Sequence, residues 1–348
     1  MDDVMMEKQS IYVPRDIKAT LENDARLFEI LHESGPYKDQ INLNSLINRV
    51  IQGYYESYTE YCAALKEDIR NTLEGYIKKP SELSDAVIKL YHQTLKINDP
   101  SSKGSVVKIS MRPTVDTSDV MNALSQQLDY SESLMNYISR MIISYSARPL
   151  YERERIVFRE TYTDLTRYCK KGTAAIFIAK LTKKSHTVLP YRISVNNEEM
   201  GNYLLCQEYD ENSKRYQARS YRLSRIESLK SAVNVHLSLQ EDVKKHLDLT
   251  DRYASQYAIN SDEIIEVSLS QDGVDLYNRI YTSRPVPKEI VQDGERYIYR
   301  FDCSPRQIIL YFRRFEKDSA LIVSPKRLRD QMVGFHNGVV KAYRETGR

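Results

Sequence analysis

The sequence predicts an α+β multidomain protein with three successive domains. Three observations predict it: a strand–helix–helix order that occurs twice near the start, short alternating strands in the middle, and an alternation of strands and helices at the end. We place a duplicated helical domain at 1–149, a small bent β-barrel at 150–240 and a small α/β domain at 260–348. With 348 residues, 41% of them apolar, the chain is long enough for a hydrophobic core in each domain.

The sequence also argues against several classes of protein. No uncharged apolar run approaches the ~20 residues that span a bilayer, and the first residues lack the order of a signal peptide. The four cysteines lie far apart without a CxxC pair, as in reduced cytoplasmic proteins. There is no close pair of metal-binding histidines, no phosphate-binding glycine loop and no Gly-x-Ser-x-Gly turn. We therefore expect a cytoplasmic protein that is not an enzyme, with no membrane segment, metal, cofactor or catalytic residue.

The first domain contains one pattern twice. In each copy a short alternating strand ends before a proline, and a helix with apolar residues at spacings of three and four follows. The strands lie at 10–13 and 107–111, and each copy closes with a Ser-Leu-x-Asn helix, at Ser45 or at Ser133. A single copy cannot bury both its strand and its helices, so it normally pairs with another. Here the same chain can supply the partner.

This order resembles the ribbon-helix-helix family, in which two strands form an antiparallel ribbon over a base of helices. In DNA-binding members the ribbon enters the major groove of the duplex. The resemblance implies that four side chains face the core: Ile11, Val13, Ile109 and Met111. The outward residues, which would contact DNA, are Lys8, Ser10, Tyr12, Lys108, Ser110 and Arg112. The alternative is a unit that serves pairing or scaffolding alone.

Charge distinguishes the two parts of the chain. Residues 1–149 hold 17 Lys and Arg against 21 Asp and Glu, whereas the remaining residues hold 34 against 27. A net acidic ribbon domain does not favour strong DNA binding, because affinity depends on contacts to phosphates. We therefore expect a surface for anions in the second part of the chain.

Tyrosine is abundant, with 27 residues, and forms a stripe at helical spacing that includes Tyr54, Tyr58 and Tyr61. Its flat ring and hydroxyl suit base stacking and protein packing alike. We expect the stripe to pack in the core or at a dimer contact, and a stacking surface for nucleic acid is the alternative.

The middle of the chain consists of short alternating strands separated by polar turns. Three elements lie in them: Pro-Tyr-Arg at 190–192, Asn-Tyr-Leu at 202–204, and Arg-x-Tyr-Arg-Leu-x-Arg-Ile at 219–226. In this order they resemble a WYL domain, although Asn202 stands where the family has tryptophan. The resemblance covers about residues 152–236. It implies an Sm/SH3-like barrel that senses a ligand, with nucleic acid a recurring choice.

The charges of this region agree with a bound nucleic acid. Six basic residues and one acidic residue lie between Lys214 and Lys230, and five further lysines lie between Lys170 and Lys184. Arginine donates two parallel hydrogen bonds to a phosphate, and tyrosine stacks on bases. The residues that we predict to bind a single strand are Arg192, Tyr203, Arg215, Arg219, Tyr221, Arg222 and Arg225. The alternative is a solvated basic face with tyrosines in the barrel core.

The last region alternates three strands with three helices, which predicts a small open sheet covered by helices. It resembles the ferredoxin-like extension that commonly follows WYL domains, which implies dimer contacts and an influence on the ligand site. Arg306, Arg313 and Arg314 are further candidates for an anion contact, and a solvated helix face is the alternative.

The whole combination resembles the WYL accessory proteins of type VI-D CRISPR systems, which target RNA. The resemblance implies a homodimer that binds single-stranded RNA and enhances a partner nuclease in antiviral defence. Single-stranded DNA stays open as a ligand, because contacts to the 2′-hydroxyl decide that choice. Two alternatives remain: a ligand-sensing transcription regulator whose ribbon binds operator DNA, and a scaffold with an incidental basic patch.

Overall fold

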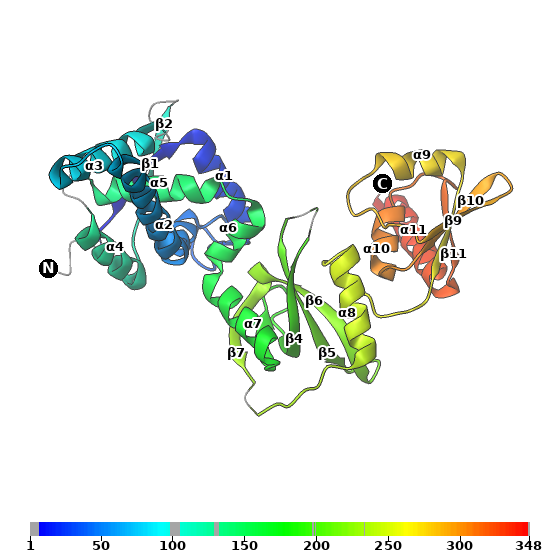
Figure 1. Ribbon diagram of the computed structural model, residues 1–348. Helices are drawn as coiled ribbons and strands as arrows, with labels where there is room; N and C mark the ends of the chain where they lie inside the picture. The colour runs from blue at the N-terminus through cyan, green and yellow to red at the C-terminus, as the bar shows by residue number, and fades with distance from the viewer. Residues whose placement is uncertain are drawn as a thin grey trace. The chain divides into compact units, whose positions relative to one another are not determined.

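The computed structural model describes residues 7–97, 105–128, 132–196, 198, 200–232 and 234–346 (Figure 1). The chain divides into two compact units, Met1–Glu160 (unit 1) and Thr161–Arg348 (unit 2). Over the described residues, helices and three antiparallel sheets of two, four and five strands make a protein of mixed helices and strands, as the predicted α+β class requires. Unit 2 contains most of two predicted domains, and the predicted boundaries at 150, 240 and 260 stay predictions.

A two-stranded ribbon forms in unit 1 from strands that lie far apart in the sequence. Strand β1 (Gln9–Pro14) pairs antiparallel with β2 (Val106–Met111), and Ile11 lies opposite Ile109. Successive side chains of a strand point to opposite faces. The four side chains expected to face inward are buried, as predicted: Ile11, Val13, Ile109 and Met111. A single chain therefore supplies both strands of the ribbon.

Three helices of unit 1 begin at a polar residue whose side chain accepts a hydrogen bond from a backbone N–H of the first turn. The helices are α1 (Arg15–Leu27), α2 (Leu43–Glu74), α3 (Pro80–Ile97), α4 (Val115–Gln127), α5 (Leu134–Ser146) and α6 (Leu150–Val157). The Asn42 side chain accepts the Ser45 N–H at 2.9 Å, and Thr114 and Ser133 cap α4 and α5 in the same way. Ser133 therefore begins its helix, whereas Ser45 lies inside α2 because Asn42 is the cap.

The tyrosine stripe of α2 lies in the core at its amino end and is exposed at Tyr61 and, just after the helix, at Tyr76. Tyr54 and Tyr58 are each 2% exposed, and the Tyr58 ring meets Tyr137 of α5 edge-on, with centroids 5.2 Å apart. Tyr61 is 50% exposed. The packing interpretation is therefore confirmed for the first two tyrosines of the stripe.

A buried ion pair joins α6 to α1. Asp24 is fully buried and accepts two hydrogen bonds from Arg153, at 2.8 and 2.9 Å. Tyr145 of α5 donates a third at 2.8 Å, and burial raises the pKa of this phenol, so that it stays a donor. Three helices of unit 1 therefore meet at one buried carboxylate.

Five strands of unit 2 form one antiparallel sheet in the order β6-β5-β4-β3-β7. They are β3 (Ala175–Ala179), β4 (Ser185–Val195), β5 (Asn202–Asp210), β6 (Arg215–Arg222) and β7 (Ile226–Ser231). A 3₁₀ turn, Leu223–Arg225, passes the chain directly from one edge of the sheet to the other. Among the described residues no strand pairing joins β6 to β7, so the sheet is open where the sequence predicts a barrel.

Two helices accompany this sheet, α7 (Arg159–Lys171) before it and α8 (Glu241–Tyr253) after it. Val243 and Leu247 of α8 are buried in one cluster with Leu205 of β5 and Ala218 of β6. This packing fixes α8 on the sheet and determines which of its acidic residues reach the strands.

The end of the chain forms a four-stranded antiparallel sheet in the order β11-β8-β10-β9. Its elements are β8 (Ile265–Leu269), α9 (Gln271–Arg279), β9 (Glu289–Asp293), β10 (Arg296–Phe301), α10 (Pro305–Phe312), β11 (Ala320–Ser324) and α11 (Lys326–Thr346). The predicted alternation lacked only β9, a strand whose side chains are all exposed. The aromatic core includes Tyr277, Tyr299, Phe301 and Tyr311. None of the described helices combines the length and apolar character needed to cross a bilayer.

Candidate nucleic-acid interface

The outer face of the ribbon carries the six residues predicted to contact DNA. Tyr12 lies opposite Lys108, and Ser10 lies opposite Ser110. Five of the six are exposed and Ser10 is half-buried; the exposed residues are Lys8, Tyr12, Lys108, Ser110 and Arg112. The ribbon therefore presents cationic, hydroxyl and aromatic groups on one face, which is the chemistry of phosphate and base contacts.

Three side chains of α2 hold the chain where it leaves β2. Asn44 Oδ1 accepts the Arg112 N–H at 2.7 Å. Asn48 donates to the Arg112 carbonyl at 3.1 Å and accepts the Thr114 N–H at 2.9 Å, and Gln52 donates to Thr114 Oγ1 at 3.0 Å. These contacts fix the backbone of Arg112, while its side chain stays exposed.

Acids from other elements hold two of the predicted arginines of unit 2. Arg192 of β4 donates to Asp251 of α8 at 2.5 Å, and this hydrogen bond raises the pKa of Arg192. Arg219 of β6 forms ion pairs with two residues of β5: Glu208, with 3.6 Å between Nε and Oε2, and Asp210. A guanidinium bound to a carboxylate presents less positive charge to a phosphate.

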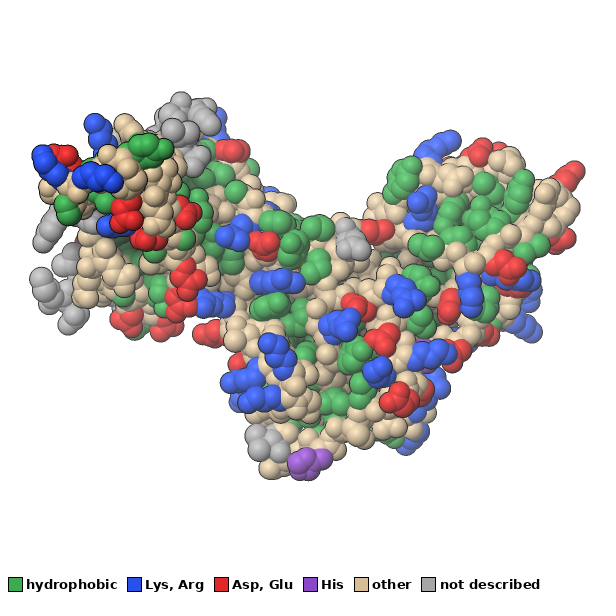
Figure 2. Space-filling view, in the orientation of Figure 1, with side chains coloured by type: hydrophobic (Ala, Val, Ile, Leu, Met, Phe, Trp, Pro, Cys, Tyr) green, Lys and Arg blue, Asp and Glu red, His purple; other side chains and the backbone are tan. Residues whose placement is uncertain are grey.

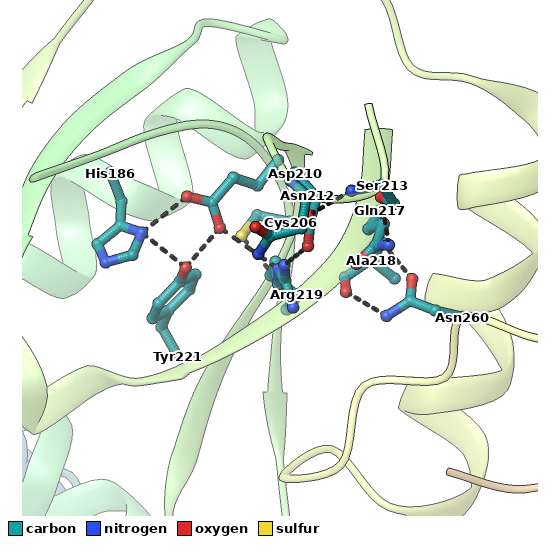
Figure 3. Close-up of polar contacts among 11 residues, drawn as sticks. His186, Cys206, Asp210, Asn212, Ser213, Gln217, Ala218, Arg219, Tyr221 and Asn260 are labelled. Carbon is teal, nitrogen blue, oxygen red and sulfur yellow. Dashed lines mark hydrogen bonds and ion pairs between the residues drawn. The ribbon is translucent and has the colours of Figure 1, made fainter. Parts of the chain in front are cut away.

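Tyr221 belongs to a hydrogen-bonded cluster (Figure 3). Its hydroxyl donates to Glu208 Oε2 at 2.5 Å and lies 2.9 Å from Nδ1 of His186. That same nitrogen lies 2.7 Å from Glu208 Oε1. The Phe177 ring meets Tyr221 edge-on, with centroids 5.0 Å apart. Burial raises the pKa of the Tyr221 phenol, and neighbouring Glu208 adds to the shift, so the hydroxyl keeps its proton.

The remaining predicted residues differ in accessibility. Tyr203 is 8% exposed, so its ring packs inside unit 2. Arg215 is exposed at the start of β6. The guanidinium of Arg222 lies over Gly201, where an added Cβ would come within 3.5 Å of it. Arg225 is half-buried. The role of these residues in binding stays a prediction.

Between residues 170 and 230, six described positions of unit 2 combine exposure with the absence of an acidic partner. This exposed cation set is Lys170, Lys171, Lys184, Lys214, Arg215 and Lys230. All six add to the positive charge that the sequence shows in this region, and only Arg215 is among the residues that it predicts to bind a strand. The sequence could have indicated that Glu208 pairs with an arginine, because Glu208 and Asp210 lie at alternate positions of a strand that pairs with an arginine-rich one. It gives no such indication for Asp251.

Metal binding finds no support in the described part of the chain, where no three His, Cys, Asp or Glu side chains are grouped to hold an ion.

Comparison with known proteins gives a similarity over nearly the whole chain. No protein-family model matches the sequence, and no curated protein matches it. A solved structure described as a CRISPR Cas-related protein is similar over 98% of this chain and 95% of that one, with a TM-score of 0.63 and 21% sequence identity. This chain therefore shares the fold of that protein.

Another solved structure, proteasome accessory factor B/C (PafBC) of Arthrobacter aurescens, aligns with 65% of this chain and 35% of that one. The identity is 14% and the TM-score is 0.24, which is too low to indicate a shared fold.

Proposed function

We propose that this protein is a non-catalytic accessory protein that binds single-stranded RNA through unit 2 and enhances an RNA-targeting CRISPR nuclease. The observation that carries the proposal is the exposed cation set of unit 2, defined above. Cations without acidic partners can contact phosphates at no cost in broken ion pairs. The shared fold with a CRISPR Cas-related protein over nearly the whole chain supports the accessory role.

A competition assay at about 150 mM salt tests the proposal, because lower salt exaggerates non-specific attraction. The full chain is bound to labelled single-stranded RNA and challenged with unlabelled RNA, single-stranded DNA and duplex DNA of the same sequence. The proposal expects single strands to compete and duplex to fail. Absence of RNA binding at this salt would refute it.

The ribbon supports a second candidate function, a transcription regulator that binds operator DNA. The observation in its favour is the outer face, on which exposed Tyr12 lies opposite exposed Lys108, while exposed Arg112 follows the end of β2, on a ribbon made by one chain. Competition by one particular duplex, and not by single strands, would favour this candidate over the first.

We also propose that two copies of the chain associate. Helix α11 buries only Leu328 among the described residues, and it exposes five large apolar side chains: Val333, Phe335, Val339, Val340 and Tyr343. Exposed apolar faces of this kind mark interaction sites. Light scattering after size exclusion measures the mass, and a monomer at micromolar concentration would refute the dimer.

A further inference from the structure

One face of α7 forms an open groove with a volume of about 400 Å³. We name it the α7 groove. Its lining residues are Tyr162, Thr163, Thr166, Arg167, Lys170 and Lys171. None of them belongs to the set that the sequence predicts to bind a strand.

The helical repeat explains why these residues share one face. Tyr162, Thr166 and Lys170 are spaced by four residues and form one row, and the residue after each of them forms a second row. The opposite face of α7 carries Leu165 and Tyr168, which are buried. Burial of that face turns both rows of the groove outward, along about 12 Å of helix.

The groove changes in chemistry along its length. At the carboxyl end, Lys170 and Lys171 are exposed and belong to the exposed cation set. Arg167 donates to Asp164 at 2.6 Å, and its guanidinium lies 5.4 Å from the centroid of Tyr168, so it is oriented and partly neutralised. The two lysines therefore supply most of the positive charge.

Hydroxyl groups and an aromatic ring line the rest of the groove. The Thr166 hydroxyl donates to the Tyr162 carbonyl at 2.7 Å, which leaves its oxygen free to accept a hydrogen bond. The Tyr162 ring is half-buried at the amino end. Cations for phosphates, hydroxyls for sugars and a ring for a base are the groups that a single-stranded nucleic acid requires.

The surface charge agrees with this arrangement. Lys and Arg side chains gather over the part of unit 2 where Figure 1 draws α7, and Figure 2 shows few acidic side chains beside them. By contrast, the predicted Arg192 and Arg219 are bound to Asp251, Glu208 and Asp210.

We propose that the α7 groove binds single-stranded RNA, with Lys170 and Lys171 on phosphates and Tyr162 against a base. This inference rests on the proposed function and names the surface that performs it. It adds two lysines of the helix before the sheet to the backbone contacts that the sequence predicts for the arginines.

Two variants of the full chain test the proposal with labelled oligouridine RNA at about 150 mM salt. Lys170→Gln with Lys171→Gln should weaken binding about tenfold and reduce the slope of log affinity against log salt by about 1.4, because two phosphate contacts are lost. Tyr162→Leu should weaken binding about fivefold, since base stacking on a ring contributes about that much or more.

A charge-matched variant is the control. Lys288→Gln with Lys317→Gln removes two exposed lysines of the same unit that have no acidic partner among the described residues. It should bind RNA within about twofold of wild type. Circular dichroism and thermal unfolding confirm that each variant is folded.

The outcomes separate the two proposals. If the wild-type protein does not bind RNA, the proposed function is wrong, and so is the proposal that the α7 groove binds RNA. If the wild-type protein binds RNA and the Lys170/Lys171 variant binds it no more weakly than the control, the α7 groove is not the binding site. The proposed function is then unaffected.

Discussion

The outer face of the ribbon and the basic surface of the five-stranded sheet have similar residue types, but their cations are held differently. On the ribbon, Lys8 and Lys108 are exposed and have no acidic partner in the described chain. On the sheet, Arg192 and Arg219 are bound to carboxylates. The difference shows that strand alternation determines which face a residue occupies, and that its partners across the fold determine whether its charge is available.

The largest effect should come from a charge that serves the fold alone. Asp24→Asn removes the buried carboxylate that binds Arg153 and Tyr145 and leaves the guanidinium without its charged partner. We expect a loss of about 3–5 kcal/mol in the free energy of unfolding, measured with urea. Asp119→Asn, an exposed acid on α4, should change it by less than about 0.5 kcal/mol. Equal effects of the two variants would contradict the distinction between buried and exposed charge.

The next prediction concerns the sheet arginines. Arg222→Ala and Arg225→Ala should each weaken RNA binding by about 1–3 kcal/mol, the range for a charged hydrogen bond. Arg192→Ala should cost less than about 1 kcal/mol, because Asp251 already binds this guanidinium at 2.5 Å. Fluorescence anisotropy measures all three variants. Unchanged binding by both Arg222→Ala and Arg225→Ala would remove the sheet arginines from the proposed site.

Much of the fold could be predicted because its signals are local. The order strand–helix–helix, found twice, predicted that the two copies pair, and its resemblance to ribbon-helix-helix proteins implied the inward face with Ile11 and Ile109. The closure of the five-stranded sheet could not be predicted in this way. Closure depends on the position of β7 after the turn at Leu223–Arg225. That position is set by the twist and pairing of the whole sheet.

The site was less predictable for a related reason. The sequence shows that Arg192 is basic, but not that α8, packed on the sheet through Val243 and Leu247, brings Asp251 to it. In the same way, Tyr221 meets His186, a residue that is 35 positions away. The sequence therefore shows that the region is basic, and pairing between distant elements decides which of its cations are bound to carboxylates.

The ribbon can be tested against the sheet directly. If the ribbon binds duplex DNA, Lys108→Ala with Arg112→Ala should weaken that binding about tenfold, or about 1.4 kcal/mol, and leave binding of single strands unchanged. The backbone contacts of Arg112 to Asn44 and Asn48 do not involve its side chain, so the fold should persist. Lys38→Ala with Lys89→Ala removes the same charge elsewhere in unit 1 and is the control. If the ribbon variant and the control bind duplex as wild type does, the ribbon has no part in binding.

The smallest effect should be a gain. Glu208→Gln removes one of the two acids that hold Arg219, while the amide can still accept from the Tyr221 hydroxyl. Because less of the arginine charge is then neutralised, RNA affinity should rise about threefold, or about 0.6 kcal/mol. Glu263→Gln, an exposed acid in the same unit, corrects for the general change in charge. A gain no larger than that of the control would mean that Arg219 contacts no phosphate even when freed. Whether a cation of the ribbon or of the sheet contributes to RNA binding would then depend on the path of the bound strand. Pairing with carboxylates would not decide it.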